Sequence, residues 1–216
     1  MFLSYSPPAF SDSLNNENIS KRLFDFLLVL LSAPIWLPLF GLLCLVVKFK
    51  IGSPVLFRQL RPGKNNIPFR LVKFRTMTNA KDAQGNLLPD SERLNRFGKF
   101  LRSSSMDEIP ELLNVLRGEM SLVGPRPLRM QYLDRYSSTQ ARRHEVRPGI
   151  TGWAQINGRN AISWEQKFDL DVWYVDHHSL WLDIKILALT LFQVFARHGI
   201  NAPGEATAAE FMGSRS

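Results

Sequence analysis

Cysteine is nearly absent from this chain, and that bounds its chemistry. The 216 residues include one cysteine, Cys44, so an intramolecular disulfide is excluded and nothing argues for an oxidising compartment. The four histidines have no partner cysteine, and the adjacent His177 and His178 point to different sides of a helix. A zinc site is therefore not expected.

Common nucleotide-binding and hydrolase motifs are missing as well. The chain contains neither a Gly-x-Ser-x-Gly nucleophile elbow nor a dinucleotide-binding glycine fingerprint, and it has no internal repeat. Its length suits one domain with a core of its own, or one domain plus a membrane element, rather than two full domains.

Positive charge is what the chain has in excess. The formal net charge is +8 at pH 7. Such an excess predicts an anionic partner, which could be nucleic acid, acidic lipid headgroups or a phosphorylated small molecule. Charge alone does not choose among these three classes.

The longest apolar run, residues 23–47, is long enough to cross a bilayer, which takes about 20 residues. Pro34 and Pro38 lie in its middle and predict a break, because each removes a helix hydrogen bond. Basic residues flank both ends of the run, at Lys21, Arg22, Lys48 and Lys50. Both ends are therefore expected on the cytoplasmic side, with residues 21–47 forming a re-entrant helix-break-helix. A spanning helix, a signal sequence and a core helix remain the alternatives.

The rest of the chain predicts an α-rich α+β fold. Alternating residues at 55–59 and 69–74, around a turn-rich stretch, indicate a small β-hairpin. Leu94, Phe97 and Leu101 recur at helical spacing. Ser163 and Gln166 have capping-box spacing and predict a helix to about His177, and residues 180–195 form a helix that is either core or interfacial.

The most informative stretch is residues 103–116. Ser105 and Glu108 have the spacing of a capping box, which predicts that Asp107 and Glu108 lie in the first turn of a helix ending near Gly118. The positive end of the helix dipole would favour their ionised form. With Arg102 and Arg126 on either side, these carboxylates suit a phosphorylated substrate and a divalent cation. The alternative is an ordinary capped helix.

Two further segments are predicted to be loops. Residues 124–127, Gly-Pro-Arg-Pro, should form a stiff loop that aims Arg126 at a specific place. Residues 147–160 are glycine-rich and carry Arg147 and Arg159, so they are either a structural turn region or a phosphate-contacting loop.

In combination these residues resemble one family. Segments 21–25, 73–77, 124–127 and 147–152, together with Arg102 and the Asp107–Glu108 pair, resemble the bacterial sugar transferases known as monotopic phosphoglycosyl transferases. The resemblance runs in order from about Lys21 to the C-terminus. The short length and the segments 157–164 and 204–207 are most similar to the members that use UDP-N,N′-diacetylbacillosamine.

The resemblance implies a reaction and its site. A sugar-1-phosphate would pass from a UDP-sugar to undecaprenyl phosphate at the cytoplasmic face of the bacterial inner membrane, with release of UMP. Asp107 would be the nucleophile that forms an aspartyl-phosphosugar, and Glu108 would hold Mg²⁺ or deprotonate the acceptor. Mg²⁺ would be the cofactor, with Asp107 and Glu108 as its ligands.

The remaining matches are polar residues around that site. Arg102, Arg126, Arg147 and Arg159 match phosphate-binding positions of the family, and Lys73, Asp171 and Asp183 match other active-site positions. The family breaks its hairpin at Ser-Pro, whereas here Ser32-Ala33-Pro34 is followed by Pro38, so either proline could make the bend.

The predicted organisation is a disordered lead-in (1–20), the membrane hairpin (21–47), a cytoplasmic catalytic domain (48–200) and a C-terminal tail (201–216). Membrane lipids and downstream glycosyltransferases would be further partners, and nucleic acid would not. The identity of the UDP-sugar stays open. The rival function is a membrane-tethered protein that binds nucleic acid or anionic lipid, which needs basic charge but no carboxylate pair.

Overall fold

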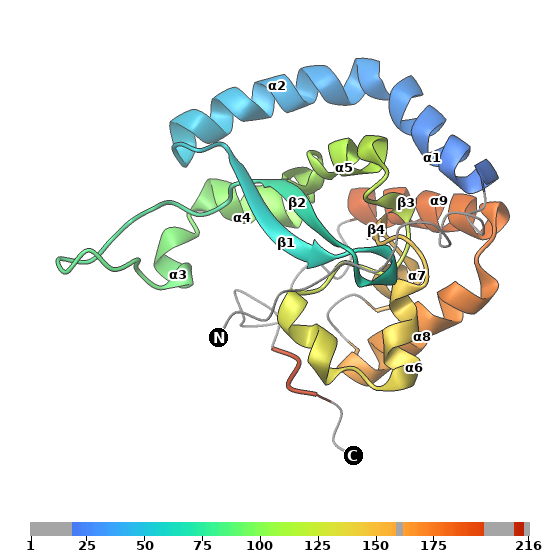
Figure 1. Cartoon of the computed structure of the whole chain (residues 1–216). Coiled ribbons are helices and arrows are strands. Elements are labelled where there is room, and N and C mark those ends of the chain that lie inside the picture. The colour runs from blue at the N-terminus through green and yellow to red at the C-terminus, as the bar shows by residue number, and fades with distance from the viewer. Residues whose placement is uncertain (1–18, 159–161, 197–209, 214–216) are drawn as a thin grey trace.

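The computed structural model describes residues 19–158, 162–196 and 210–213 (Figure 1). Most of the predicted lead-in (residues 1–18), most of the predicted tail and Arg159 lie outside these residues. The longer helices are α1 (Ile19–Leu31), α2 (Ala33–Lys50), α4 (Arg96–Ser103), α5 (Glu111–Arg117), α8 (Trp164–His177) and α9 (Leu180–Ala196). The strands are β1 (Leu56–Pro62), β2 (Pro68–Phe74), β3 (Ser121–Val123) and β4 (Gly149–Thr151). Short helical segments complete the chain: η1 (Lys64–Asn66), α3 (Asp90–Arg93), η2 (Met106–Glu108), η3 (Met130–Arg135), α6 (Ser138–Ala141), η4 (Arg142–His144) and α7 (Trp153–Ile156).

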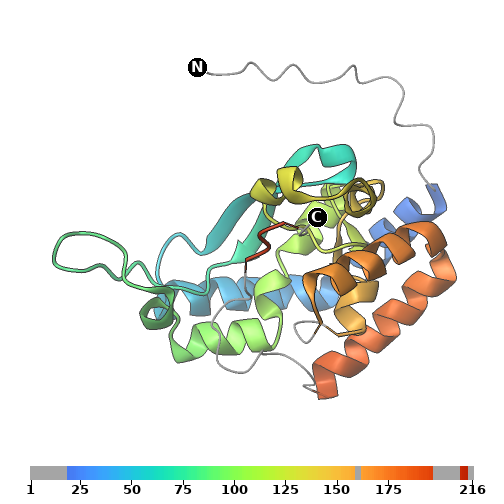
Figure 2. The same ribbon diagram turned by 90° about the horizontal axis from the view of Figure 1, so that it is seen from below.

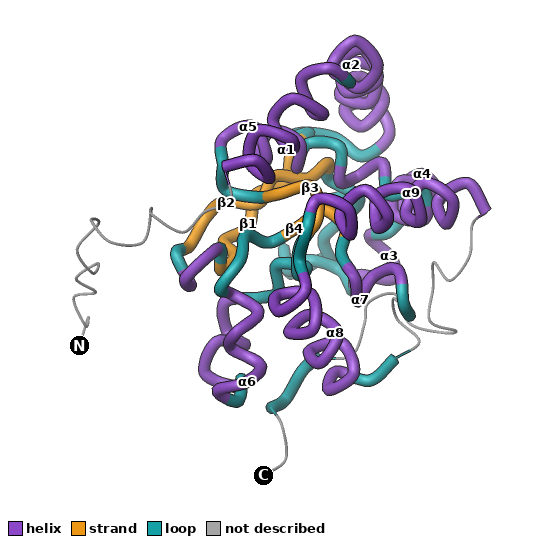
Figure 3. Tube along the Cα trace, turned by 90° about the vertical axis from the view of Figure 1, so that its right-hand side faces the viewer, coloured by secondary structure: helices purple, strands orange, loops and turns teal. Residues whose placement is uncertain are grey.

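These elements form layers around the strands. In Figures 1 and 3, α1, α2 and α5 lie on one side of the strands, and α6 and α8 lie on the other. Figure 2 shows the molecule from below, with α4 at one end and α9 at the other. The main core contains Val29, Trp36, Val115, Tyr174 and Ile186, from α1, α2, α5, α8 and α9. The N-terminal helices are therefore packed against the rest of the protein. The prediction of an α-rich fold with a small hairpin is confirmed.

The apolar run does break, at Ser32. The Ser32 hydroxyl donates to the carbonyl of Leu28 (2.8 Å), and Trp36 Nε1 donates back to the carbonyl of Val29 (3.0 Å), which holds α1 and α2 at the bend. Pro34 is in the first turn of α2, where a missing N–H costs little. Pro38 lies inside α2. Of the two prolines that could make the bend, Pro34 is the one next to the break, and α2 continues through Pro38.

Among the described helices, α2 alone is long and apolar enough to cross a membrane by length and composition. Several of its large apolar side chains are exposed, as are others on α1 and α9. They include Ile35, Leu42, Trp181, Leu191 and Phe192.

The predicted β-hairpin is confirmed and is longer than expected. β1 and β2 pair antiparallel from Leu56↔Phe74 to Pro62↔Pro68. Asn65, in the connection between them, has a positive φ of 53°, a conformation that asparagine tolerates better than most residues. The long pairing carries Lys73 to a fixed position beside α5.

A second, parallel strand pair was not predicted. β3 pairs with β4, with Ser121 opposite Gly149 and Val123 opposite Thr151. Segment 147–160, predicted to be mostly loop, instead contains β4 and α7. Strands of three residues are too short to show alternation, so the sequence carried no signal for them.

The predicted capping box at Ser105 is wrong. Ser105 has a positive φ of 56° and its side chain makes no capping hydrogen bond. Asp107 and Glu108 lie in the 3₁₀ turn η2, and α5 begins at Glu111, after Pro110. The helix does end at Gly118, with a φ of 83°. The second predicted capping box is confirmed: Ser163 and Gln166 cap each other at the start of α8.

Candidate active site

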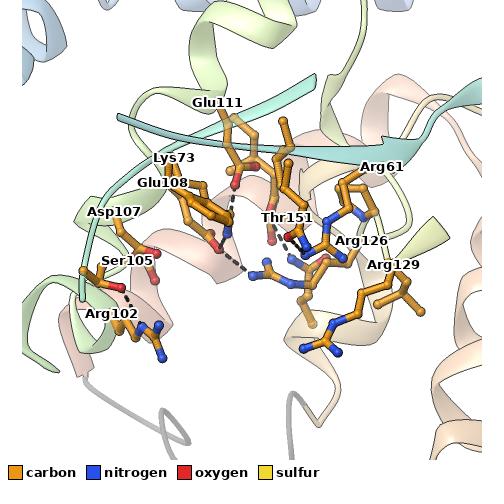
Figure 4. A pocket seen from close by; sticks show the side chains of 18 of the residues that line it. Arg61, Lys73, Arg102, Ser105, Asp107, Glu108, Glu111, Arg126, Arg129 and Thr151 are labelled. Carbon is orange, nitrogen blue, oxygen red and sulfur yellow. Dashed lines mark hydrogen bonds and ion pairs between the residues drawn. The ribbon is translucent and has the colours of Figure 1, made fainter. Parts of the chain in front are cut away.

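A cleft of about 960 Å³ lies in the middle of the molecule, between the hairpin, α5, β4 and α8 (Figure 4). Six of the residues predicted for the site line it: Lys73, Arg102, Asp107, Glu108, Arg126 and Asp171. They come from β2, α4, η2, the loop after β3, and α8. The structure thus brings together residues that are far apart in the sequence.

Glu108 is at the centre of the charged groups. Its Oε1 accepts hydrogen bonds from Lys73 Nζ (2.7 Å) and from Arg126 Nη2 (2.6 Å). Burial alone raises the pKa of Glu108, but the charges of Arg126 and Lys73 outweigh it and hold this pKa well below its ordinary value. Glu108 is therefore ionised and organises both cations.

Asp107 has a different environment, although it is the adjacent residue. Burial, and then the negative charge of Glu108, raise the pKa of Asp107 to about 6, against the opposing charges of Lys73, Arg126 and Arg102. Figure 4 draws no hydrogen bond to its carboxylate from the residues shown. At neutral pH a pKa of about 6 leaves the Asp107 side chain mostly ionised.

Glu111 belongs to the same group and was not predicted. It is 2% exposed, and its Oε1 lies 3.0 Å from Lys73 Nζ, although this contact lacks the geometry of a hydrogen bond and no other described residue supplies one. Burial, and then the charge of Glu108, raise the pKa of Glu111 to about 7. Its sequence signal was the three-residue spacing from Glu108, which places both acids on one side of the chain.

Asn114 sets the distance between α5 and β2. Its side chain is fully buried, accepts a hydrogen bond from Val72 N (3.1 Å) and donates to the carbonyl of Arg70 (2.8 Å). It satisfies backbone groups on either side of Leu71 in the strand that carries Lys73. Lys73 is thereby held within reach of both glutamates.

Asp171 positions Arg126 indirectly. Arg143 is buried and pairs with Asp171, at 2.7 Å between Nη2 and Oδ2, and the same Nη2 donates to the Arg126 carbonyl (2.8 Å). The loop 124–127 also lies directly on β4: a Cβ at Gly124 would be 2.3 Å from the Arg147 carbonyl oxygen. The glycine and the ion pair together fix the base of the Arg126 side chain.

Arg102 and two arginines that were not predicted add to the cationic lining. Arg102 Nε donates to Thr76 Oγ1 (3.0 Å). Arg61 on β1 and Arg129 beyond the Gly-Pro-Arg-Pro loop also line the cleft. Neither lies in a motif, and only the tertiary structure brings them to the site.

Arg147 and Asp183 lie elsewhere. Arg147 Nε donates to the carbonyl of Gly118 (2.5 Å), at the end of α5. Asp183, on α9, is fully buried, pairs with Lys21 (2.5 Å) and accepts a hydrogen bond from the Tyr174 hydroxyl (2.6 Å). Neither residue lines the cleft. Asp183 instead fastens α1 to α9.

We therefore expect Asp183→Ala to lower stability rather than to alter substrate binding. Removing one partner of a buried ion pair leaves Lys21 without its acceptor and costs about 3 kcal/mol or more, although the Tyr174 hydroxyl keeps the Val123 carbonyl (3.1 Å). Thermal unfolding in detergent measures this. The control is Asp176→Ala, which removes an exposed pair with Arg142 and should cost less than about 1 kcal/mol. Equal losses in the two variants would contradict the anchoring role.

The carboxylates fit a magnesium ion. Burial, and then the charge of Glu108, raise the pKa of Asp107, so a cation bound there would stabilise its ionised form. Among the described residues, no group of three or more acidic, histidine or cysteine side chains could hold a metal alone. One or two carboxylates completed by substrate phosphates is the usual coordination of Mg²⁺. Asp107 and Glu108 are the residues that would hold it.

The sequence is similar to those of known sugar transferases. Residues 16–197 match the family described as "Bacterial sugar transferase". The chain is 59% identical to an uncharacterized sugar transferase of Bacillus subtilis, over 91% of this chain and 97% of the relative. It is 38% identical to a UDP-glucose:undecaprenyl-phosphate glucose-1-phosphate transferase of Caulobacter vibrioides, over 81% and 69% of the two chains.

A third relative transfers a different sugar. The chain is 36% identical to a UDP-N-acetylgalactosamine-undecaprenyl-phosphate N-acetylgalactosaminephosphotransferase of Aeromonas hydrophila, over 83% of this chain and 44% of the relative. The chain spans less than half the length of several such relatives. The family match covers most of the chain, including Asp107, Glu108 and Glu111. This protein is therefore an enzyme that belongs to the bacterial sugar transferase family.

Proposed function

We propose that this protein is a phosphoglycosyl transferase that moves a sugar-1-phosphate from a UDP-sugar to undecaprenyl phosphate and releases UMP. This would be the first membrane step in the synthesis of a glycan. The observation that carries the proposal is the position of the Asp107 carboxylate, beside Glu108 and its partners Lys73 and Arg126 in a cleft lined by cations. The names of the relatives support the donor and acceptor classes.

The reaction would proceed in two displacements at one phosphorus atom. In the first, an Asp107 oxygen attacks the sugar-bearing phosphorus of the UDP-sugar, and the bond from this phosphorus to the oxygen of the UMP group breaks. In the second, a phosphate oxygen of undecaprenyl phosphate attacks the same phosphorus, and the bond to Asp107 breaks. Both carboxylate oxygens are then free again, and a difficult step has been divided into two easier ones.

The neighbours of Asp107 would hold the charges that this chemistry moves. Lys73 and Arg126, fixed by Glu108, face the phosphate oxygens, and Arg102 lies on the side of Asp107 (Figure 4). Mg²⁺ bound at Asp107 and Glu108 would neutralise diphosphate oxygens and make UMP a better leaving group. The alternative role of Glu108, as the base that deprotonates the acceptor, is disfavoured because Arg126 and Lys73 hold its pKa well below the ordinary value.

Intact-mass measurement tests the proposal. Purified protein is incubated with a UDP-sugar and Mg²⁺ without undecaprenyl phosphate. The mass should rise by one sugar phosphate, UMP should be released in equal amount, and peptide mapping should place the adduct on Asp107. EDTA should prevent both signals. UMP release that requires both substrates, with no adduct, would overturn the two-step reaction.

We infer that the donor is an N-acetylated UDP-sugar, such as UDP-N,N′-diacetylbacillosamine. The resemblance in segment 157–164 supports this choice. The named relatives use UDP-glucose and UDP-N-acetylgalactosamine. A panel that includes these donors, UDP-N-acetylglucosamine and UDP-galactose would decide by the rate of UMP release. A clear preference for UDP-glucose would reject the N-acetylated donor.

We also propose that α1 and α2 form a re-entrant hairpin that keeps both chain ends at the cytoplasmic face. The break at Ser32, the packing of α1 against the core and the basic residues at both ends support this topology. The site would then face its soluble donor. The division into lead-in, hairpin, cytoplasmic domain and tail follows from the same proposal.

Cysteine labelling in intact cells tests the topology. In a Cys44→Ser background, Ser4→Cys and Glu92→Cys should both resist a membrane-impermeant reagent. Adding Pro34→Leu should straighten the break and expose Ser4→Cys to labelling in part of the molecules, whereas Pro38→Leu, inside α2, should not. Labelling of Ser4→Cys without any proline substitution would show that the segment spans the membrane.

A further inference from the structure

Three arginines lie together at the end of the cleft away from Asp107. Arg61 comes from β1, and Arg126 and Arg129 follow β3. In Figure 4 their guanidinium groups are on the opposite side of Glu108 from Asp107 and Arg102. Burial, and then the charges of Arg126 and Arg129, lower the pKa of Arg61 to about 10, which shows how closely the three charges gather. We call these residues the arginine group.

Nearby acids balance the arginine group only in part. Arg126 pairs with Glu108 at 2.6 Å, and Arg129 is 4.0 Å from Glu210. Arg61 donates from Nη2 to the neutral side chain of Gln59 (2.6 Å), and its buried Nε has no hydrogen-bond partner among the described residues. A buried donor without an acceptor is costly. The arginine group therefore has two properties of a phosphate site: excess positive charge, and a hydrogen-bond donor, Arg61 Nε, that no described residue uses.

The position of the arginine group relative to Asp107 indicates which phosphate it takes; this step rests on the proposed function. In a displacement at phosphorus, the attacking and the leaving oxygens lie roughly in line on opposite sides. With Asp107 on one side, the oxygen of the departing UMP must be on the other, where the arginine group lies. In the second displacement Asp107 is the leaving group, so the attacking oxygen of the lipid phosphate must come from that same far side.

We propose that Arg61, Arg126 and Arg129 form one phosphate site that is used twice, first for the phosphate of the departing UMP and then for the phosphate of the incoming polyprenol phosphate. The two ligands exclude each other because they occupy the same position. Arg102 lies on the side of Asp107, so it cannot bind the phosphate of UMP or of polyprenol phosphate. It faces the phosphoryl group that is transferred. Arg61 and Arg129 thereby become binding residues for both half-reactions.

The test measures the two half-reactions separately in Arg61→Gln. The first is the rate of UMP release with UDP-sugar alone, and the second is the loss of the adduct when undecaprenyl phosphate is added. Each should slow by about tenfold or more, since a charge-assisted contact to phosphate is lost. The control is Arg58→Gln on the same strand, whose exposed side chain does not line the cleft and which should match wild type.

Inhibition by UMP gives a second readout. In wild type, UMP should compete with undecaprenyl phosphate, and its inhibition constant should rise by about tenfold or more in Arg61→Gln but not in Arg58→Gln. Slowing of the first half-reaction alone would overturn the shared site and assign the arginine group to the nucleotide. Equal rates in Arg61→Gln and Arg58→Gln would overturn it entirely.

Two further measurements keep these conclusions separate from folding and from the proposed function. If thermal unfolding shows that Arg61→Gln does not fold, Arg129→Gln, whose side chain is about half exposed, decides by the same assays. A wild-type protein that forms no adduct and releases no UMP refutes the proposed function. A fully active wild type with unaffected arginine variants refutes only the shared phosphate site.

Discussion

Asp107→Asn is expected to abolish turnover while leaving the fold intact. The amide keeps the shape of the side chain but cannot act as the attacking anion, and loss of a catalytic nucleophile costs roughly 10⁴-fold or more in rate. The fold should not suffer, because burial and the charge of Glu108 already disfavour the ionised form of Asp107. UMP release and thermal unfolding, measured on one preparation, should therefore separate chemistry from stability.

The matched control for Asp107→Asn is Asp169→Asn. Asp169 is exposed on α8 and does not line the cleft, so this variant should keep wild-type activity. Near-normal UMP release by Asp107→Asn would rule out the covalent role of Asp107. A protein that only bound nucleic acid or anionic lipid would show no UDP-sugar turnover in wild type and no change in binding in this variant.

Glu108→Gln is expected to slow both half-reactions by about a hundredfold or more, because Glu108 organises two cations as well as carrying its own charge. Lys73 and Arg126 both donate to Oε1 of Glu108, and a neutral amide would hold neither as firmly. Lys73 would then pair with Glu111, and Arg126 would lose its carboxylate. The protein should keep its fold but lose the arrangement of positive charge that faces the phosphates.

Glu111→Gln provides the comparison for Glu108→Gln. In the wild type, the pKa of Glu111 is raised to about 7, so this side chain is already partly neutral at working pH. Glu111 pairs with Lys73 but not with Arg126. Glu111→Gln should therefore slow both half-reactions less than Glu108→Gln does. Adduct formation, followed by intact mass, and chase of the adduct with undecaprenyl phosphate measure the two steps. A larger loss in Glu111→Gln than in Glu108→Gln would show that Glu108 does not have the central position.

Asp183 and Lys73 differ in their contacts in a way that the sequence did not predict. Both residues matched polar positions of the family, but Lys73 contacts Glu108 across 35 residues of sequence, whereas Asp183 pairs with Lys21 across 162. One contact forms the site, and the other fastens a helix. A motif specifies which residues are present, but the packing of distant elements decides what each of them touches.

Local patterns along the chain predicted several features. Alternation predicted the hairpin, capping-box spacing predicted the start of α8, prolines in a long apolar run predicted the bend, and the adjacent Asp107 and Glu108 pointed to the chemistry. Each of these signals depends on residues a few positions apart, where side-chain direction follows from backbone geometry.

Contacts between distant parts of the chain produced the remaining features. The positive φ of Ser105 replaced the expected helix cap by a 3₁₀ turn, Asn114 set β2 against α5, and the Arg143–Asp171 pair fixed Arg126. The opposite pKa shifts of the two neighbouring acids also arose there, because Lys73 and Arg126 donate hydrogen bonds to Glu108. A pKa depends on burial and on charges within a few ångströms, and those neighbours come from parts of the chain that no local pattern connects.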